Sequence, residues 1–447
     1  MRVMWFECKK ILYSKVNLIL LVIFTASIIW YFHSTVESHH ESTCEVGFHN
    51  SDGSLMNCGD VLKEISRAKE KWTGTMDQEW WTRLEKAAAK AEKNWDYQVY
   101  DIDKMRQVYG ENWYEDLKAH GEEYTDPRDA EGIKEGKKPY YSNEELAFTK
   151  SNIQDEVITT LYMNYGKTMM INRPWNEDSG TFGTMYSGYN NEQVASSVYS
   201  TPVGKEEIQL LKKTMNEKGN FHYGDSKSWF DFLNTMSMGG LLLLVWVLLI
   251  SSNLINKERK NQMMEVISSC TRSRSYLFFS KLVGAILAGF IGMVVMNGSL
   301  FLYAQFSGLL GDPNVNITES LNLISIFTYG EAFILSLAIM ALGILVCAVI
   351  GTLCSTFLKS SYRSFAVTAI LLLLPTMLFP GASGVIAKLM PENFMIIENV
   401  TIQTYTIMLG GDAYFLWKIL PLIWMPVCIL LVLVSWFWYR RPSYQRI

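Results

Sequence analysis

Six long apolar runs constrain this sequence more than any other feature. Each is close to the length of about 20 mostly apolar residues that an α-helix needs to cross a bilayer. They cover residues 11–32, 230–255, 282–306, a segment within 323–358, 364–379 and 414–439. No small-x-small cleavage site follows the first run, so we interpret it as a retained span rather than a signal peptide. The sequence predicts a polytopic α-helical membrane protein with six transmembrane helices.

The basic residues between these runs predict the orientation of the chain. Lys and Arg near the ends of spans tend to stay in the cytoplasm. They precede the first run, separate the second from the third and the fourth from the fifth, and follow the sixth. Residues 308–322 contain no Lys or Arg, and residues 380–413 contain only Lys388. Both termini are therefore predicted to be cytoplasmic, and residues 34–228 to be extracellular.

Charge and composition divide the chain into three parts: a leader with the first span (1–33), an extracellular domain (34–228) and the remaining five spans (229–447). Residues 34–228 carry 23 Lys and Arg against 34 Asp and Glu, a net charge of −11, whereas the rest of the chain carries +7. An acidic domain does not suit the phosphate backbone of a nucleic acid, so we expect no nucleic-acid partner.

The extracellular domain is predicted to be mainly helical α+β. Helix-forming patterns cover residues 76–98, 142–167 and 205–218, and a loop rich in charge, Gly and Pro covers 124–141. Its many Trp and Tyr side chains suit either a core or a site for an amphipathic ligand. No G-x-S-x-G or H-E-x-x-H motif occurs in the domain, which gives no support to an enzyme.

Two cysteines lie in the predicted extracellular domain, Cys44 and Cys58. An oxidising exterior favours a disulfide between them. A metal site is the alternative, because four histidines lie nearby, but their spacing matches no zinc pattern. The histidines are His33, His39, His40 and His49. We predict a disulfide and no metal.

A short cationic segment joins the second and third runs. Residues 257–281 read KERKNQMMEVISSCTRSRSYLFFSK, with two apolar patches separated by a polar turn. This pattern suits a short interfacial helix, a turn and the start of the next span. An alternative interpretation is a solvated loop whose charges only orient the two spans.

The same segment resembles the conserved cytoplasmic segment of ABC-2-type transporter permeases. That family has E-R, a spacer, E-x-L, a Ser-x-Pro-x-Ser-Arg turn and a hydrophobic run ending in Gly-Lys. The residues in register are Glu258, Arg259, Glu265, Ile267, Ser269, Ser273, Arg274, Leu277 and Lys281. Thr271 replaces the turn proline, Ser280 replaces the last glycine, and the usual Gly-Thr of the spacer is absent.

The resemblance implies that residues 257–281 couple the spans to a separate ABC ATPase. The residues expected at that joint are Glu258, Arg259, Glu265, Arg272, Arg274 and Lys281. The chain has no P-loop, since its nearest approach, GIKEGKK at 132–138, lacks the required spacing, so we expect no cofactor on this chain and ATP and Mg²⁺ on the partner. The resemblance also implies a second permease chain, identical or related, in a bacterial plasma membrane. The leader and the long extracellular insertion are similar to the sodium-efflux-permease-like and lantibiotic-immunity-like branches.

The spans contain few ionisable residues, which favours an amphipathic cargo over a small cation. Uncharged polar residues in them could line a path or pair the helices: Asn253, Asn297, Ser299, Gln305 and Thr368. The sequence thus predicts an exporter of a peptide, a bacteriocin or antibiotic, or a lipid-like molecule. Extrusion of sodium or another small cation is an alternative, and so is an extracellular ligand sensor that signals through the ATPase without transport.

Overall fold

A computed structural model describes the chain in segments, and these fall into two compact units. The described residues are 2–44, 56–93, 111, 124–125, 138–139, 153–172, 205–218, 221–256, 274–317, 326–358, 360–378, 389, 394 and 406–440. The first unit comprises Met1–Thr35, Thr168–Gly219 and Ser226–Ile447, and the second comprises Val36–Lys167 and Asn220–Asp225.

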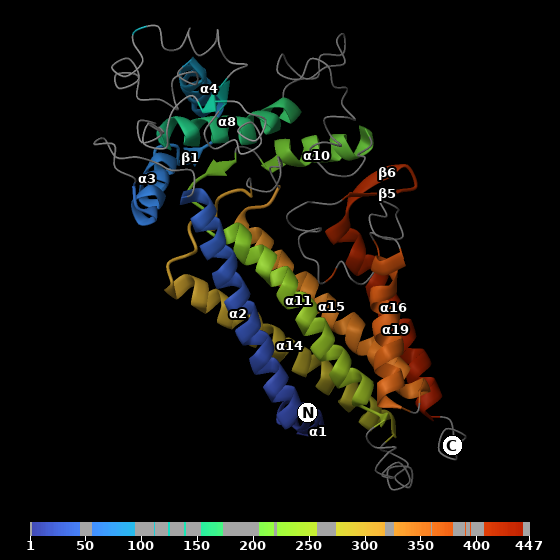
Figure 1. Cartoon of the computed structure of the whole chain (residues 1–447). Coiled ribbons are helices and arrows are strands. Elements are labelled where there is room, and N and C mark those ends of the chain that lie inside the picture. The colour runs from blue at the N-terminus through green and yellow to red at the C-terminus, as the bar shows by residue number, and fades with distance from the viewer. Residues whose placement is uncertain are drawn as a thin grey trace. The chain divides into compact units, whose positions relative to one another are not determined.

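The first unit is built from long apolar helices that run side by side (Figure 1). Those long and apolar enough to cross a membrane are α2 (Lys15–Cys44), α11 (Trp229–Asn253), α14 (Arg274–Phe306), α15 (Tyr329–Phe357) and α19 (Leu416–Arg440). A shorter helix, α16 (Ser361–Leu378), occupies the place of the predicted fifth span. The chain is therefore a polytopic helical membrane protein. The count of six spans remains a prediction, and it requires that α16 also crosses the membrane.

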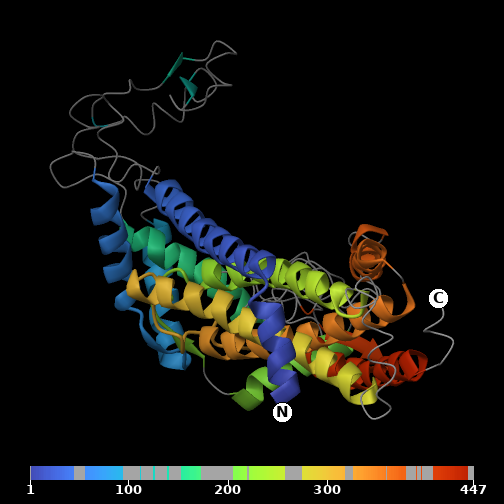
Figure 2. The same cartoon turned by 90° about the horizontal axis from the view of Figure 1, so that it is seen from below.

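The helix α2 extends well beyond the apolar run that predicts it. Its helical backbone continues from residue 32 to Cys44, through the polar sequence that follows the run. Before it, Tyr13 and Ser14 separate it from an amphipathic helix, α1 (Arg2–Leu12). Helix α1 packs on α14, as Figure 2 shows near the N-terminus.

Helices α11 and α15 form the centre of the bundle. Helix α11 packs against α14, α15 and α16, and α15 also packs against α19. The crossing of α11 and α15 is close because Gly351 faces Ser251, and a Cβ atom at Gly351 would lie 2.7 Å from the Ser251 Cβ. Small residues at such crossings let two helix backbones approach each other inside a membrane.

The first unit also contains helix α10 (Lys205–Lys218) and a hairpin of β5 (Thr406–Leu409) and β6 (Asp412–Phe415). Gly410 and Gly411 make its turn with positive φ angles of 66° and 101°, which glycine adopts without strain. Lys218 of α10 pairs with Glu331 at 2.6 Å, so α10 packs in this unit although the sequence places it in the extracellular domain.

The second unit surrounds a cluster of buried aromatic side chains. Its helices are α3 (Cys58–Glu70), α4 (Gln78–Lys93) and, up to residue 167, α8 (Ile153–Asn172); β1 (Gly74–Thr75) pairs with β4 (His222–Tyr223). Trp72, Trp80 and Trp81 are buried, and the Trp80 indole donates a hydrogen bond to the Trp72 carbonyl at 2.7 Å. These three tryptophans therefore form core rather than a binding surface.

The other predictions for this part of the chain have mixed outcomes. Helix α4 matches the helix expected over 76–98 as far as the structure describes it. Residues 142–152, with their predicted helix start, lie outside the described residues, and α8 follows at Ile153. Within the expected loop 124–141, the short strands β2 (Tyr124–Thr125) and β3 (Lys138–Pro139) pair in parallel. The structure has the disulfide Cys44–Cys58, with the two Cα atoms 5.2 Å apart.

Candidate functional site: the two ends of segment 257–273

The structure describes both ends of the predicted coupling segment. Glu258, Arg259, Glu265 and Arg272 lie outside the described residues. The chain is described up to Asn256, just past the end of α11, and again from Arg274, where α14 begins. Of the six predicted coupling side chains, the structure therefore shows the surroundings of one, Lys281.

The Lys281 side chain is buried inside the helix bundle, with 3% of the residue exposed. Its Nζ atom lies 3.8 Å from Oε2 of Glu7 in α1 and donates a hydrogen bond to the Leu254 carbonyl at 3.2 Å. Leu254 follows the last residue of α11. Lys281 thus connects three elements, and it does so from the interior rather than by facing a partner protein.

The approach of α1 to α14 depends on Gly284. A Cβ atom at this position would lie 3.2 Å from Cβ of Glu7 and 3.3 Å from the backbone nitrogen of Cys8. A larger residue would push α1 away and lengthen the Glu7–Lys281 ion pair. Cys8 is fully buried at this contact, and burial raises the pKa of its thiol.

Serine hydroxyls on two other helices hold the start of the segment. The Asn256 side chain is buried, and its Nδ2 atom donates to Oγ of Ser364 in α16 at 2.9 Å. The Ile255 amide donates to Oγ of Ser355 in α15 at 3.3 Å. The Ser364 hydroxyl in turn donates to the Cys354 carbonyl at 3.4 Å. These contacts join the end of α11 to both neighbouring helices.

Sequence reasoning identified Lys281 but missed Glu7, Asn256, Ser355 and Ser364. One signal was available, because Ser355 and Ser364 flank the basic loop that contains Lys359 and Arg363, at the predicted cytoplasmic ends of two runs. Polar residues at such ends are candidates for contacts with the neighbouring loop. Glu7 gave no such signal, since it is an acidic residue in a basic leader.

Both ends of segment 257–273 are therefore anchored to the bundle. One end is held by α15 and α16, and the other by α1 and by Leu254. Buried polar contacts of this kind cost desolvation and contribute little net stability, but they fix the geometry of the groups that they join. A displacement of the segment would act on several helices at once.

The predicted pathway residues lie at different positions along the bundle. Asn253 is exposed and lies in the same cavity wall as Lys281, whereas Gln305 is 24 residues further along α14, about 36 Å away. Asn297 is buried and donates to the Met293 carbonyl at 3.1 Å, and Thr368 is buried and donates to the Ser364 carbonyl at 2.7 Å. Ser299 is half-buried. That these five residues line a path stays a prediction.

Within the described parts of the chain, no group of three or more His, Cys, Asp and Glu side chains is placed to hold a metal ion.

A family model described as ABC-2 family transporter protein matches residues 16–439. The match extends from the start of α2 almost to the end of α19, and it includes segment 257–273. Searches of curated proteins and of solved structures gave no match.

Proposed function

The chain belongs to the ABC-2 family of transporter permeases, and from this premise we propose that it is the membrane subunit of an ATP-driven exporter. Segment 257–273 would contact a separate ABC ATPase. ATP binding and hydrolysis on that partner would move the helices, and an amphipathic molecule would be released outward. Both termini would lie in the cytoplasm, and residues 34–228 would lie outside.

The anchoring of both ends of segment 257–273 is the observation that carries this proposal. A partner ATPase can drive a membrane pathway only through an element that contacts the ATPase and is firmly joined to the spans. Lys281 contributes the joint on the α14 side, and Asn256 contributes the joint on the α11 side. We propose that Glu258, Arg259, Glu265 and Arg272 make the contacts with the ATPase, with Arg274 at the start of α14.

The partners of the complex follow from the sequence and from the exposed helix faces. The sequence has no P-loop, so ATP and Mg²⁺ would bind to the ATPase. Helices α2 and α19 expose large apolar side chains, including Val22, Trp30, Leu430 and Phe437. Lipid and a second permease chain, identical or related, would cover these faces.

The proposed cargo is a peptide, an antibiotic or bacteriocin, or a lipid-like molecule. The candidate spans are highly apolar and contain few ionisable residues, which suits an amphipathic cargo better than a hydrated cation. Residues 34–228 carry a net charge of −11, which would attract cationic peptides. The observations favour no second function over this one.

Reconstitution tests the proposal. The chain would be purified together with an ABC ATPase that binds it and placed in proteoliposomes with a labelled cationic peptide. We expect the peptide to stimulate ATP hydrolysis and to cross the membrane, and Glu265→Arg to abolish both. Glu70→Arg is the matched control, because Glu70 is an exposed residue in the last turn of α3.

Other outcomes of this experiment would indicate a different function. Stimulated hydrolysis without movement of the peptide would indicate a sensor, and ATP-dependent movement of sodium would indicate a cation pump. The proposal would be wrong if Glu265→Arg left both hydrolysis and transport unchanged.

A further inference from the structure

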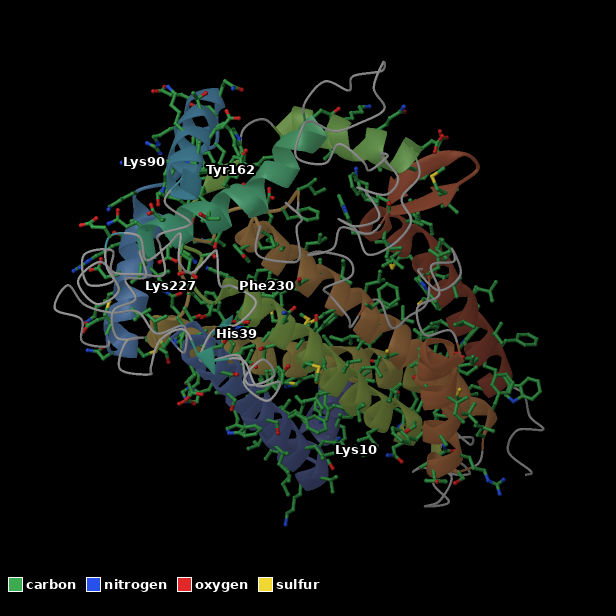
Figure 3. The ribbon with its side chains drawn as sticks, turned by 45° about the horizontal axis from the view of Figure 1, so that its top comes forward. Lys10, His39, Lys90, Tyr162, Lys227 and Phe230 are labelled. Atoms are coloured by element: carbon green, nitrogen blue, oxygen red, sulfur yellow. A yellow bond between two sulfur atoms is a disulfide. The ribbon has the colours of Figure 1, made fainter. Side chains whose placement is uncertain are left out.

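A cavity of about 320 Å³ opens at the end of the bundle where segment 257–273 begins and ends. Its wall comes from α1, the start of α2, the end of α11 and Lys281 of α14. The wall contains the charged residues Glu7, Lys10 and Lys281. It also contains apolar residues such as Val16 and Leu249. Figure 3 labels Lys10, at the α1 end of the bundle. Such a cavity suits a ligand with one charged and one apolar part.

The charged residues of the wall favour an anion. Glu7 and Lys281 form an ion pair, so their charges largely offset each other. Lys10 is exposed and adds a positive charge to the wall. The first turn of α2 lies in the same wall, and its first backbone bond runs from the Leu18 amide to the Ser14 carbonyl. The amides of residues 15–17 precede that bond, at the positive end of the helix dipole.

The apolar residues of the wall favour a ligand with a hydrocarbon tail. Val16 contributes to the cavity wall and is 65% exposed, and Leu18, Ile19, Val22 and Ile23 expose further apolar surface along α2. An acyl chain can follow this helix from the cavity into the membrane. A free phosphate ion would contact only the polar groups of the wall and would leave its apolar residues uncovered.

We propose that this cavity binds a membrane phospholipid with an anionic headgroup. The phosphate lies at Lys10 and the first turn of α2, and an acyl chain lies along the apolar face of α2. The lipid comes from the leaflet on the side of segment 257–273. Because Glu7 and Lys281 also line the cavity, the bound lipid packs against the joint that anchors α14. This inference rests on the chain being a membrane protein and does not depend on the proposed exporter activity.

Two neighbouring lysines provide a matched test. Lys9 and Lys10 are both exposed residues of α1, but only Lys10 lines the cavity, whereas Lys9 lies over the Trp5 ring, 5.6 Å from its centroid. The full chain would be placed in nanodiscs of phosphatidylcholine with a minor share of phosphatidylglycerol. Native mass spectrometry would count the retained lipids, and thermal unfolding would report their effect on stability.

We expect one phosphatidylglycerol molecule to be retained per chain. Lys10→Gln should reduce its binding about fivefold or more, in line with about 1 kcal/mol per basic residue near a membrane. Lys9→Gln should change binding less than about twofold on the same scale, and Lys10→Arg should retain the lipid. Lys10 is a surface residue, and the Lys10→Arg variant shows whether the position itself tolerates substitution.

Several results would overturn the assignment. Equal losses for Lys9→Gln and Lys10→Gln would indicate general attraction to a charged membrane. Equal retention of phosphatidylcholine or of phosphatidylethanolamine would exclude selection for an anionic headgroup. Protection by inorganic phosphate in detergent as strong as that by phosphatidylglycerol would show that the cavity binds a free anion and not a phospholipid.

Discussion

The central helices α11 and α15 and the outer helices α2 and α19 are similarly apolar in sequence, yet the chain buries them very differently. In their most apolar windows, 67% of α11 and 56% of α15 are buried, against 17% of α2 and 22% of α19. The central pair carries small and hydroxyl residues at its contacts, such as Ser251, Gly351 and Ser355. The outer pair exposes bulky side chains, such as Trp30 and Leu430.

The difference indicates that apolarity determines which helices enter the membrane. Small and polar residues then determine which of these helices pack against each other. Lipid and the interior of a helix bundle are equally apolar, so burial of hydrocarbon does not drive one helix to the centre. Close packing at small residues and hydrogen bonds between helices do so instead. Substitutions in these two classes of helix should therefore have unequal effects on the free energy of unfolding.

The largest effect is expected for Lys281→Met. This change leaves the Glu7 carboxylate buried without its cation, which costs about 3–5 kcal/mol in comparable buried pairs. The midpoint of denaturant unfolding in detergent would fall sharply. The double variant Glu7→Leu with Lys281→Met should recover most of the loss, because it buries no unpaired charge. A single Lys281→Met variant as stable as the original chain would show that the ion pair contributes nothing to the joint.

A smaller effect is expected for Gly351→Val, at the crossing of α11 and α15. The added side chain would collide with Ser251 and force the two helices apart, at a cost of about 1–3 kcal/mol. Gly298→Val in α14 is the matched control, because no atom lies within 4 Å of a Cβ atom built there. Thermal unfolding of both variants measures the difference. Similar losses of stability in the two variants would indicate that Gly351 acts through the flexibility of its helix. They would contradict a role for Gly351 in the close approach of α11 and α15.

Ser364→Ala should have a similar or smaller effect. Its loss removes the hydroxyl that accepts from Asn256, whose Nδ2 atom then keeps only its hydrogen bond to the Ser252 carbonyl, and the loss of one hydrogen bond costs about 0.5–1.5 kcal/mol. Ser435→Ala in α19 is the control, since the Ser435 hydroxyl bonds only to the Leu431 carbonyl of its own helix among the contacts described. Hydrogen exchange at residues 254–256 would report whether the end of α11 loosens. Unchanged exchange in Ser364→Ala would remove this anchor from the proposed joint.

The sequence allowed a good prediction of which segments form the helices, because an apolar run long enough to cross a membrane rarely forms another kind of structure. The approximate positions of α11, α14, α15, α16 and α19 follow from those runs. The family also followed from the sequence, because the pattern from Glu258 to Lys281 is specific. The pairing of Cys44 with Cys58 could be predicted because they are the two cysteines of residues 34–228.

The internal contacts of the site could not be predicted in this way. Glu7 and Lys281 are 274 positions apart, and they meet only because Gly284 lets α1 lie against α14. Nothing in the local pattern at either residue specifies that contact. The same holds for Asn256 and Ser364, which tertiary packing brings together. The burial of a helix likewise depends on its neighbours, so hydropathy alone could not separate α2 from α11.

The smallest effect is expected for Leu430→Ala in α19, where the side chain is 61% exposed. Detergent covers this face, so the free energy of unfolding of the single chain should change by no more than about 0.5 kcal/mol. Leu420→Ala in the same helix is the control, because Leu420 is fully buried and its truncation should cost about 2–5 kcal/mol. If a second permease chain covers α19, Leu430→Ala should instead weaken association, measured as the share of dimer by mass photometry. Equal losses of stability at positions 420 and 430 would contradict the division into central and outer faces.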